Sequence, residues 1–391
     1  MNLLVPEEQP RRRAKVLLVI PNLQQGGAER QILELLRRLP EDRFEPVLCL
    51  WHHRPHYQTL LPAGQPRHVL GVESMGAVGL RRLIAVLREE RPDILHSYRD
   101  TANLWSRLAV LGAPVPVVLT SSRNRSMAIS HLVAEPFLHR LSDRVLTNSA
   151  GIERELVARA RVPKEKVRVL HNFIDLGRFR PPSEEERQAA RRRFGLEADE
   201  IAFVLPGRLS YQKHQLGVVL AAALLARRGA LPPGLRILFA GRPTDRLYAG
   251  LLPGLIRRLR LDGVFRFLGV VEADAMPALY HAVDAVVLPS IYEGFPNALV
   301  EAHASGLPAI ASADADADGI VVPEVSGLKV RTWSVPALAA ALARLAGMTA
   351  GERRRMGELG RRNISERFHP ERILEEVVDL YEELLREKGA A

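Results

Sequence analysis

The chain has 391 residues, of which 47% are hydrophobic and 26% are charged, with 28 glycines, 27 prolines and one cysteine. This composition excludes a disordered, collagen-like or disulfide-rich protein. The length predicts two or three domains with cores of their own, and we take two as the working number. The 55 basic and 45 acidic residues give a net charge of +10. Because the basic residues lack interleaved aromatic side chains, we expect no nucleic-acid partner.

No segment has the character of a membrane span or a leader. The longest stretch without a charged residue, 108–122, contains two prolines and is too short to cross a bilayer. No cleavable signal peptide is visible near the N-terminus. We therefore expect a cytoplasmic protein. Peripheral contact with an anionic membrane surface at the inner face of the cell membrane stays open, since basic surfaces attract anionic headgroups.

Short apolar runs separated by helical patterns predict a parallel α/β sheet in the first part of the chain. The expected strands are 16–20, 47–51, 94–95, 115–120, 145–147 and 167–170. The alternation stops at 178–183 (RFRPPS), which predicts a domain boundary near Pro181.

The alternation restarts after a charged helix predicted at 184–193. The expected strands are 201–205, 236–240, 264–268, 285–288 and 308–311, followed by helical segments at 335–367 and 370–388. The sequence thus predicts two doubly wound Rossmann-like domains, 1–180 and 181–369, facing one another across a ligand cleft at the carboxyl ends of their strands.

The most informative segment is 288–301 (LPSIYEGFPNALVE), where a buried strand turns into a helix. Pro296 suits the first helical position, and Gly306 is placed to end the helix. The helix N-terminus around Gly294, Phe295, Pro296 and Asn297 offers N–H groups to a phosphate. Glu301 lies on the same helix face as Asn297 and can accept hydrogen bonds from a ribose diol, while Glu293 precedes the helix.

A second cluster, 205–214 (LPGRLSYQKH), also links a strand to a helix. Gly207 permits a sharp turn, Arg208 can bind a phosphate through two parallel hydrogen bonds, and Lys213 adds a point charge. Only six of the 55 basic residues are lysine, which makes Lys213 more informative. The segment is not a Walker loop, so nucleotide hydrolysis is not supported.

The first strand ends in 21–29 (PNLQQGGAE), where Gly26 and Gly27 allow close approach of a ligand to the backbone. These three segments together resemble the retaining glycosyltransferases of family four, which have the two-domain GT-B fold. The resemblance covers nearly the whole chain. It includes the fragments 92–96 (PDILH), 147–149 (TNS), 169–175 (VLHNFID) and 301–308 (EAHASGLP), and a closing helix at 370–388 that crosses back to the N-terminal domain.

The resemblance implies that a nucleotide sugar, most commonly UDP-linked, is held by the C-terminal domain and a glycan or lipid-linked acceptor by the N-terminal domain. Arg208 and Lys213 would neutralise the diphosphate leaving group without a metal or other cofactor, and Glu293 would hold the donor sugar or its phosphate. Glu301 would bind the ribose. The segment from Gly294 to Asn297 would add backbone donors, and Gly26 and Gly27 would approach the diphosphate.

One position departs from the family pattern. Where many relatives have a histidine, this chain has Ser122 or Arg123; an arginine cannot act as a base, although a sugar or phosphate contact is feasible. A phosphorylase or sugar-nucleotide epimerase on the same fold, and a non-catalytic basic protein that binds nucleic acid or membranes, stay as alternatives.

Two motifs that resemble metal sites are discounted. The run 314–319 (DADADG) starts like a calcium loop, but Val325 stands where a bidentate glutamate is required. The histidines at 52, 53 and 56 have no fixed geometry nearby. We therefore expect no metal site, and His96, His171 and His303 are interpreted as structural.

Overall fold

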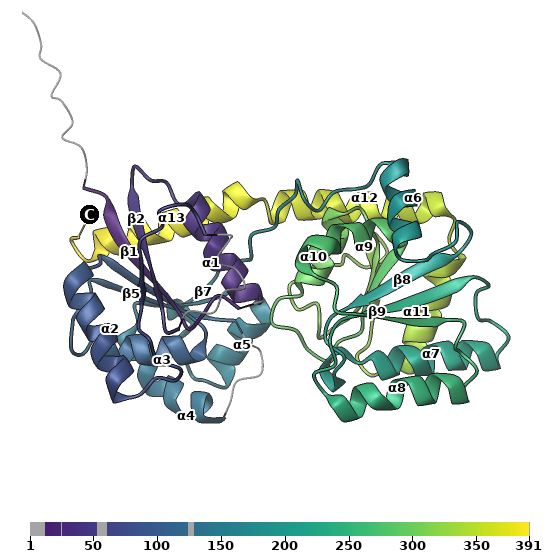
Figure 1. Ribbon diagram of the computed structural model, residues 1–391, viewed down its shortest axis with the longest axis horizontal. Helices are drawn as coiled ribbons and strands as arrows, with labels where there is room; N and C mark the ends of the chain where they lie inside the picture. Colours follow the sequence, from purple (N-terminus) through teal and green to yellow (C-terminus); the bar gives the residue numbers. More distant parts are fainter. Residues whose placement is uncertain (1–11, 25, 53–60, 124–128, 391) are drawn as a thin grey trace, which may run out of the picture. The chain divides into compact units, whose positions relative to one another are not determined.

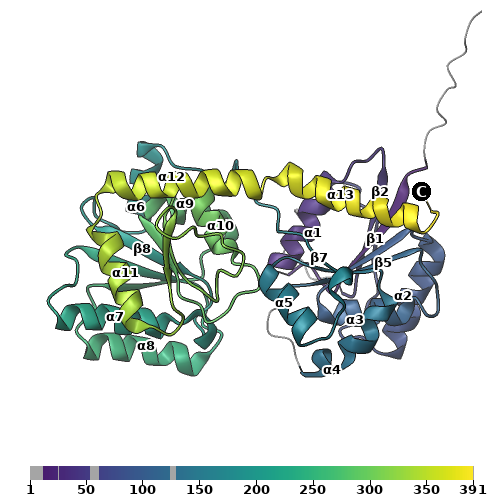
Figure 2. The same ribbon diagram turned by 180° about the vertical axis from the view of Figure 1, so that it is seen from behind.

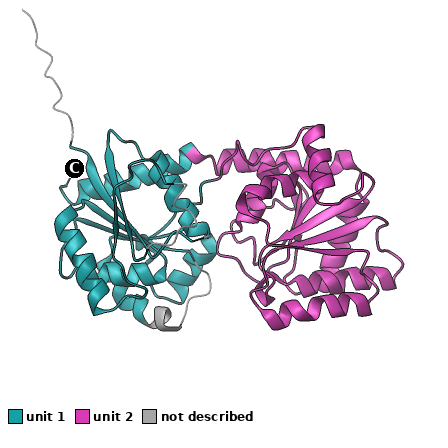
Figure 3. Ribbon diagram, viewed as in Figure 1, with its two compact units in different colours: residues 1–173, 371–391 teal, residues 174–370 magenta. Residues whose placement is uncertain are grey.

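The computed structural model describes residues 12–24, 26–52, 61–123 and 129–390. The chain divides into two compact units, residues 1–173 with 371–391 and residues 174–370 (Figure 3). The sequence analysis set its division at 180/181. The C-terminal helix belongs to the first unit, although 197 residues of the second unit precede it in the chain.

The first unit contains a parallel sheet in the order β3-β2-β1-β4-β5-β6-β7. Its strands are β1 (Ala14–Ile20), β2 (Phe44–Leu50), β3 (Arg67–Val69), β4 (Ile94–Tyr98), β5 (Val117–Ser122), β6 (Arg144–Thr147) and β7 (Val167–Val169). The strand order reverses between β1 and β4: β2 and β3 follow on one side of β1, and β5, β6 and β7 follow on the far side of β4. β1 and β4 pair directly, with Val16 opposite Ile94. In sheets of this kind, ligands bind beyond the carboxyl ends of the strands at such a reversal.

Helices cover both faces of this sheet (Figure 1). One face is packed by α1 (Gly27–Arg38) and α13 (Pro370–Glu387), and the other by α2 (Ala77–Glu90) and α3 (Asp100–Ala109). The unit also contains α4 (Ile129–Leu138) and α5 (Ala150–Ala158). The apolar stripe of α13 explains its position, because Val377, Tyr381 and Leu384 are buried against β1 and β2 in one continuous core.

The second unit contains a parallel sheet in the order β10-β9-β8-β11-β12-β13. Its strands are β8 (Ile201–Pro206), β9 (Leu235–Ala240), β10 (Phe265–Gly269), β11 (Ala285–Leu288), β12 (Ala309–Ser312) and β13 (Gly327–Val330). Here the strand order reverses between β8 and β11, which pair directly, with Ala285 opposite Phe203. The two loops that the sequence singled out follow these two strands.

Helices again form layers on both sides of the sheet (Figure 2). A hydrophobic core joins the sheet to α7 (Gln215–Arg227), α8 (Arg246–Arg258) and α11 (Val335–Gly347). The other layer contains α6 (Glu184–Arg193), α9 (Met276–Ala282), α10 (Asn297–Ala304) and α12 (Ala350–Arg367). The expectation of two doubly wound α/β domains is confirmed.

Several boundaries differ from the sequence prediction. The segment 335–367 is two helices, because Thr349 caps α12 through a capping box with Glu352 and ends the helical run. Pro296 is the residue before α10 and not its first residue, while Gly306 follows the helix with φ 76°, as a C-terminal glycine should. Within the described residues, no helix combines the length and hydropathy that crossing a membrane requires.

Candidate active site

In the second unit, the loops after β8 and β11 are fastened to one another. The Ile291 N–H donates to the Gln212 carbonyl oxygen at 2.8 Å, and the Gln212 side chain donates to the Tyr292 carbonyl oxygen at 2.9 Å. Because β8 and β11 are neighbours at the point where the strand order reverses, these bonds hold both loops over the position where such sheets bind ligands.

Lys213 and Glu293 form the centre of this site. Their Nζ and Oε1 atoms are 2.7 Å apart, and the side chains are only 14% and 9% exposed. Gly207 leaves room for the lysine, since a Cβ there would lie 2.8 Å from Lys213 Cε, and its φ of 135° is one that other residues rarely adopt. The structure thus brings together two residues that are 80 positions apart in the sequence.

Arg208 is exposed beside this pair. Its Nη2 donates to Gln212 Oε1 at 3.3 Å, and its carbonyl oxygen is held by the Gln215 side chain at 2.9 Å. The Gln212 amide fixes the guanidinium without cancelling its charge, so Arg208 can still bind an oxyanion bidentately.

Glu301 projects from α10 and is held by a residue that the sequence analysis did not identify. The hydroxyl of Tyr280, on α9, donates to Glu301 Oε2 at 2.9 Å. Tyr280 itself is completely buried. This contact fixes the orientation of a half-buried carboxylate on the helix that begins at Asn297.

The turn before α10 satisfies part of its own hydrogen bonding. The Asn297 N–H donates to the Phe295 carbonyl oxygen, and the Leu299 N–H to that of Pro296, both at 2.9 Å. Proline has no N–H of its own. Of the four residues from Gly294 to Asn297, Pro296 therefore has no N–H to offer a ligand, and the N–H of Asn297 is already used within the turn.

Within the first unit, the glycine pair at the end of β1 lies beside a buried carboxylate. Gly26 caps α1 and Gly27 begins it; a Cβ at Gly26 would overlap Glu29 Oε2. Glu29 is 4% exposed and accepts a 3.0 Å hydrogen bond from Arg99 Nη1. Arg99 has φ 81° and ψ 148°, a region normally occupied by glycine, and such strain is concentrated at functional sites.

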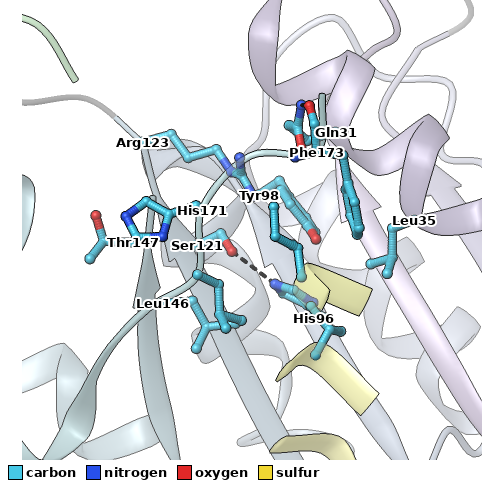
Figure 4. Close-up of a pocket in the computed structure, with 13 residues that line it drawn as sticks. Gln31, Leu35, His96, Tyr98, Ser121, Arg123, Leu146, Thr147, His171 and Phe173 are labelled. Carbon is cyan, nitrogen blue, oxygen red and sulfur yellow. Dashed lines mark hydrogen bonds between the residues drawn. The ribbon is translucent and has the colours of Figure 1, made fainter. Parts of the chain in front are cut away.

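The first unit also has a pocket at the carboxyl ends of β4, β5, β6 and β7 (Figure 4). Arg123, one of the two acceptor-side candidates, lines it, but the other, Ser122, is not among the residues that do. Ser122 is buried in β5 with a hydroxyl that has no hydrogen-bond partner. The structure therefore separates the two residues that the sequence left as alternatives.

His96 closes the floor of this pocket (Figure 4). Its Nδ1 lies 2.7 Å from the Tyr381 hydroxyl and its Nε2 lies 2.8 Å from Ser121 Oγ. Burial, helped by the nearby Arg123 charge, lowers the pKa of His96 to about 3. The imidazole is thus neutral at physiological pH, in keeping with the structural role expected for it.

In the run 314–319, the Asp316 side chain bonds to neighbouring groups of the protein. The Asp316 carboxylate accepts hydrogen bonds from the N–H groups of Ile320 and Val321 and pairs with Lys329. The described residues include no group of three or more histidine, cysteine or acidic side chains suited to a metal ion. His53 and His56 lie outside the described residues.

Solved structures share this architecture. HepE from Anabaena, determined in complex with UDP and glucose, is 21% identical, with a TM-score of 0.82 over 95% of this chain and 100% of that one. A glycosyltransferase from Rickettsia africae is 19% identical, with a TM-score of 0.83 over 96% of this chain and 99% of that one. These likenesses establish the GT-B fold.

Family comparisons assign the chain to its family. Residues 25–178 match the model of Glycosyltransferase Family 4, and residues 186–363 match that of Glycosyl transferases group 1. The D-inositol 3-phosphate glycosyltransferase of Salinispora tropica is 28% identical over 93% of this chain and 82% of its own length. The chain therefore belongs to the family-four, group 1 glycosyltransferases and is a glycosyltransferase.

Proposed function

We propose that this enzyme transfers a sugar, with retention of configuration, from a UDP-linked donor to a glycan or glycolipid acceptor of cell-envelope polysaccharide synthesis. The observation that carries the proposal is the Lys213–Glu293 ion pair in the same loops as Arg208, at the point where the strand order of the second unit reverses. UDP is favoured because HepE, which has the same fold, has been solved with UDP and with UDP-glucose.

Leaving-group stabilisation is the chemistry these side chains can perform. As the bond between the sugar C1 and the phosphate oxygen breaks, negative charge grows on the diphosphate. Lys213 and Arg208 supply cations at that point, so we propose that transfer needs no metal. Glu293, bonded to Lys213, is placed to orient the donor sugar or fix the ammonium group.

The remaining steps need no protein nucleophile. The acceptor hydroxyl would attack C1 from the face that the diphosphate leaves, and its proton would pass to a donor phosphate oxygen. Glu301, oriented by Tyr280, would bind the ribose hydroxyls, while Gly294 and the backbone near Gly207 would donate to the phosphates. We also propose that the backbone at Gly26 and Gly27 lies close to the diphosphate of the bound donor.

Nucleotide selectivity tests the donor assignment. Thermal unfolding would be followed with UDP, GDP, ADP and their glucose conjugates, since a ligand at 100 times its dissociation constant stabilises a protein by about 2.7 kcal/mol. We expect stabilisation by the uridine ligands, its loss in Arg208→Ala, and its retention in Arg227→Ala, which removes an exposed arginine at the end of α7. Equal effects of all nucleotides, or none, would contradict the UDP assignment.

Metal independence and retention have their own readouts. Release of UDP from UDP-glucose should be unchanged by EDTA, and NMR of the transferred sugar should show the anomeric configuration of the donor. Inverted product would exclude front-face attack.

Peripheral membrane contact is proposed from the net charge of +10. The protein should sediment with vesicles that contain anionic lipid and not with neutral vesicles, and salt should release it. Binding that is the same for both vesicle types would contradict this localisation.

A further inference from the structure

The pocket of the first unit is lined by a positively charged side chain and by no negatively charged one among the described residues. Arg123 lines it, but the described residues around it include neither aspartate nor glutamate. The polar side chains of Tyr98 and Ser121 stand at the ends of the neighbouring strands β4 and β5 along its wall (Figure 4). The space, including the part open to solvent, is about 370 Å³.

Arg123 is held in place by neutral groups. Its Nη1 donates to Asn172 Oδ1 at 2.6 Å, and its guanidinium carbon lies 4.9 Å from the centre of the Tyr98 ring. These contacts orient the guanidinium but leave its charge uncompensated. Its Nε is shielded from solvent and has no hydrogen-bond acceptor. A shielded cation in this situation gains most from an anionic partner.

The carboxylate that attracts Arg123 already has a hydrogen-bond partner. Glu29 attracts Arg123 electrostatically, but its hydrogen bond goes to Arg99 Nη1 at 3.0 Å. Two guanidinium groups therefore face one carboxylate, which leaves an excess of one positive charge beside the pocket. Burial lowers the pKa of Arg123, yet an arginine stays protonated at any physiological pH.

We propose that this pocket binds an anionic substituent, a phosphate or a carboxylate, on the acceptor sugar, with Arg123 as its donor. The proposal rests on the proposed sugar transfer, because it names the chemical class of the acceptor. It adds that a neutral sugar is a poor acceptor for this enzyme.

The test is calorimetric binding of matched probes to the full chain at constant ionic strength. Glucose 6-phosphate, glucuronate and inorganic phosphate would be compared with neutral glucose, with and without saturating UDP. We expect glucose 6-phosphate, glucuronate or both to bind, glucose not to bind, and UDP not to compete. Preference between the phosphate and the carboxylate identifies the substituent. Displacement by UDP would place the anion at the diphosphate site and overturn the proposal, as would equal binding of glucose.

Variants locate the anion. Arg123→Gln should weaken anion binding about 10- to 100-fold, as expected for loss of a charge-assisted hydrogen bond. Arg168→Gln, which removes an exposed arginine from β7 of the same unit, should leave it unchanged. Arg123→Lys, which keeps a positive charge but loses the planar pair of donors, should weaken it several-fold and serves if Arg123→Gln fails to fold. Unchanged affinity in either folded variant would refute the site.

The proposed sugar transfer and the proposed anion site are tested by separate measurements. Stabilisation by UDP is measured independently of the anion and should persist in Arg123→Gln. If UDP does not bind but the sugar phosphate does, the donor assignment fails and the anion site stands.

Discussion

The Lys213–Glu293 ion pair combines a structural and a chemical role. Both side chains are largely shielded, so removing one leaves the other as an uncompensated charge, at a cost of about 1–3 kcal/mol in unfolding free energy. Removing both charges avoids this cost. Stability and activity should therefore respond differently to the same set of substitutions.

We predict that Lys213→Met and Glu293→Gln each lower the free energy of unfolding, and that the double variant recovers most of the loss. Turnover should stay at least 100-fold reduced in all three, because the leaving group has lost its cation or the cation its orienting partner. Chemical denaturation and UDP release from UDP-glucose provide the two readouts. A double variant that regains activity would show that the pair is only structural.

His96 should make the first unit sensitive to acid. Its pKa of about 3 lies below the ordinary value of 6.5, so between these values the unfolded chain binds a proton that the folded chain excludes. Stability is full above pH 6.5 and falls by about 1.4 kcal/mol per pH unit as the pH decreases toward 3.

We predict that His96→Asn reduces this slope by about one proton, measured by urea unfolding between pH 5 and 6.5. The matched control is Tyr381→Phe, which removes the hydroxyl 2.7 Å from His96 Nδ1 but keeps the imidazole. It should cost about 1 kcal/mol at every pH and leave the slope unchanged. Equal slopes in wild type and His96→Asn would assign the acid sensitivity to other groups.

Individual candidate residues were predictable where the local pattern already implied a ligand. Arg208, Lys213 and Glu293 lie at strand-to-helix turns and Glu301 on the helix that follows one, and a single sequence shows such turns. Tyr280 could not be found in this way, because its role depends on packing α9 against α10.

At the scale of elements, the loop after β8 depends on close contact with the end of β9. Gly207 N–H donates to the Ala240 carbonyl oxygen at 2.8 Å, and a Cβ at Gly241 would overlap the Gly207 carbonyl oxygen. The glycine at 241 therefore allows the loop carrying Arg208 and Lys213 to lie directly over the sheet.

We predict that Gly241→Ala displaces this loop, weakens UDP binding at least tenfold and costs about 1–3 kcal/mol in stability, as overpacking does. Gly250→Ala is the control, since no atom lies within 4 Å of its Cβ position on α8; alanine there should stabilise the helix by up to about 1 kcal/mol. Calorimetry with UDP and thermal unfolding measure both effects. Unimpaired UDP binding in Gly241→Ala would contradict the proposed dependence.

The strands that the sequence analysis missed lie at sheet edges. β3 is three residues long and mostly exposed, and β13 contains a glycine and a lysine. Neither has the continuous apolar run that marked the central strands. β4 extends beyond its predicted end through His96, Ser97 and Tyr98, polar residues whose burial depends on tertiary hydrogen bonds.

At the scale of the whole molecule, the chain passes from the first unit to the second and back again. The last helix completes a core whose other members lie more than 200 residues earlier, including Leu146 and Leu170. The closing helix was predictable from its stripe of apolar residues, and its return to the first unit from the family resemblance. Each unit has a hydrophobic core of its own, which allows them to unfold separately.

We predict two thermal transitions that respond to different changes. Leu384 is fully buried in the core of the first unit, so Leu384→Ala should cost about 2–5 kcal/mol and lower one transition. UDP should raise the other, since the proposed donor site lies in the second unit. Asp379→Ala, on the exposed side of the same helix, should move neither transition appreciably. Scanning calorimetry of the three proteins with and without UDP distinguishes the cases: a single transition moved by both Leu384→Ala and UDP would mean that the two units unfold cooperatively, and a change at Leu384 would then affect the stability of the donor site as well.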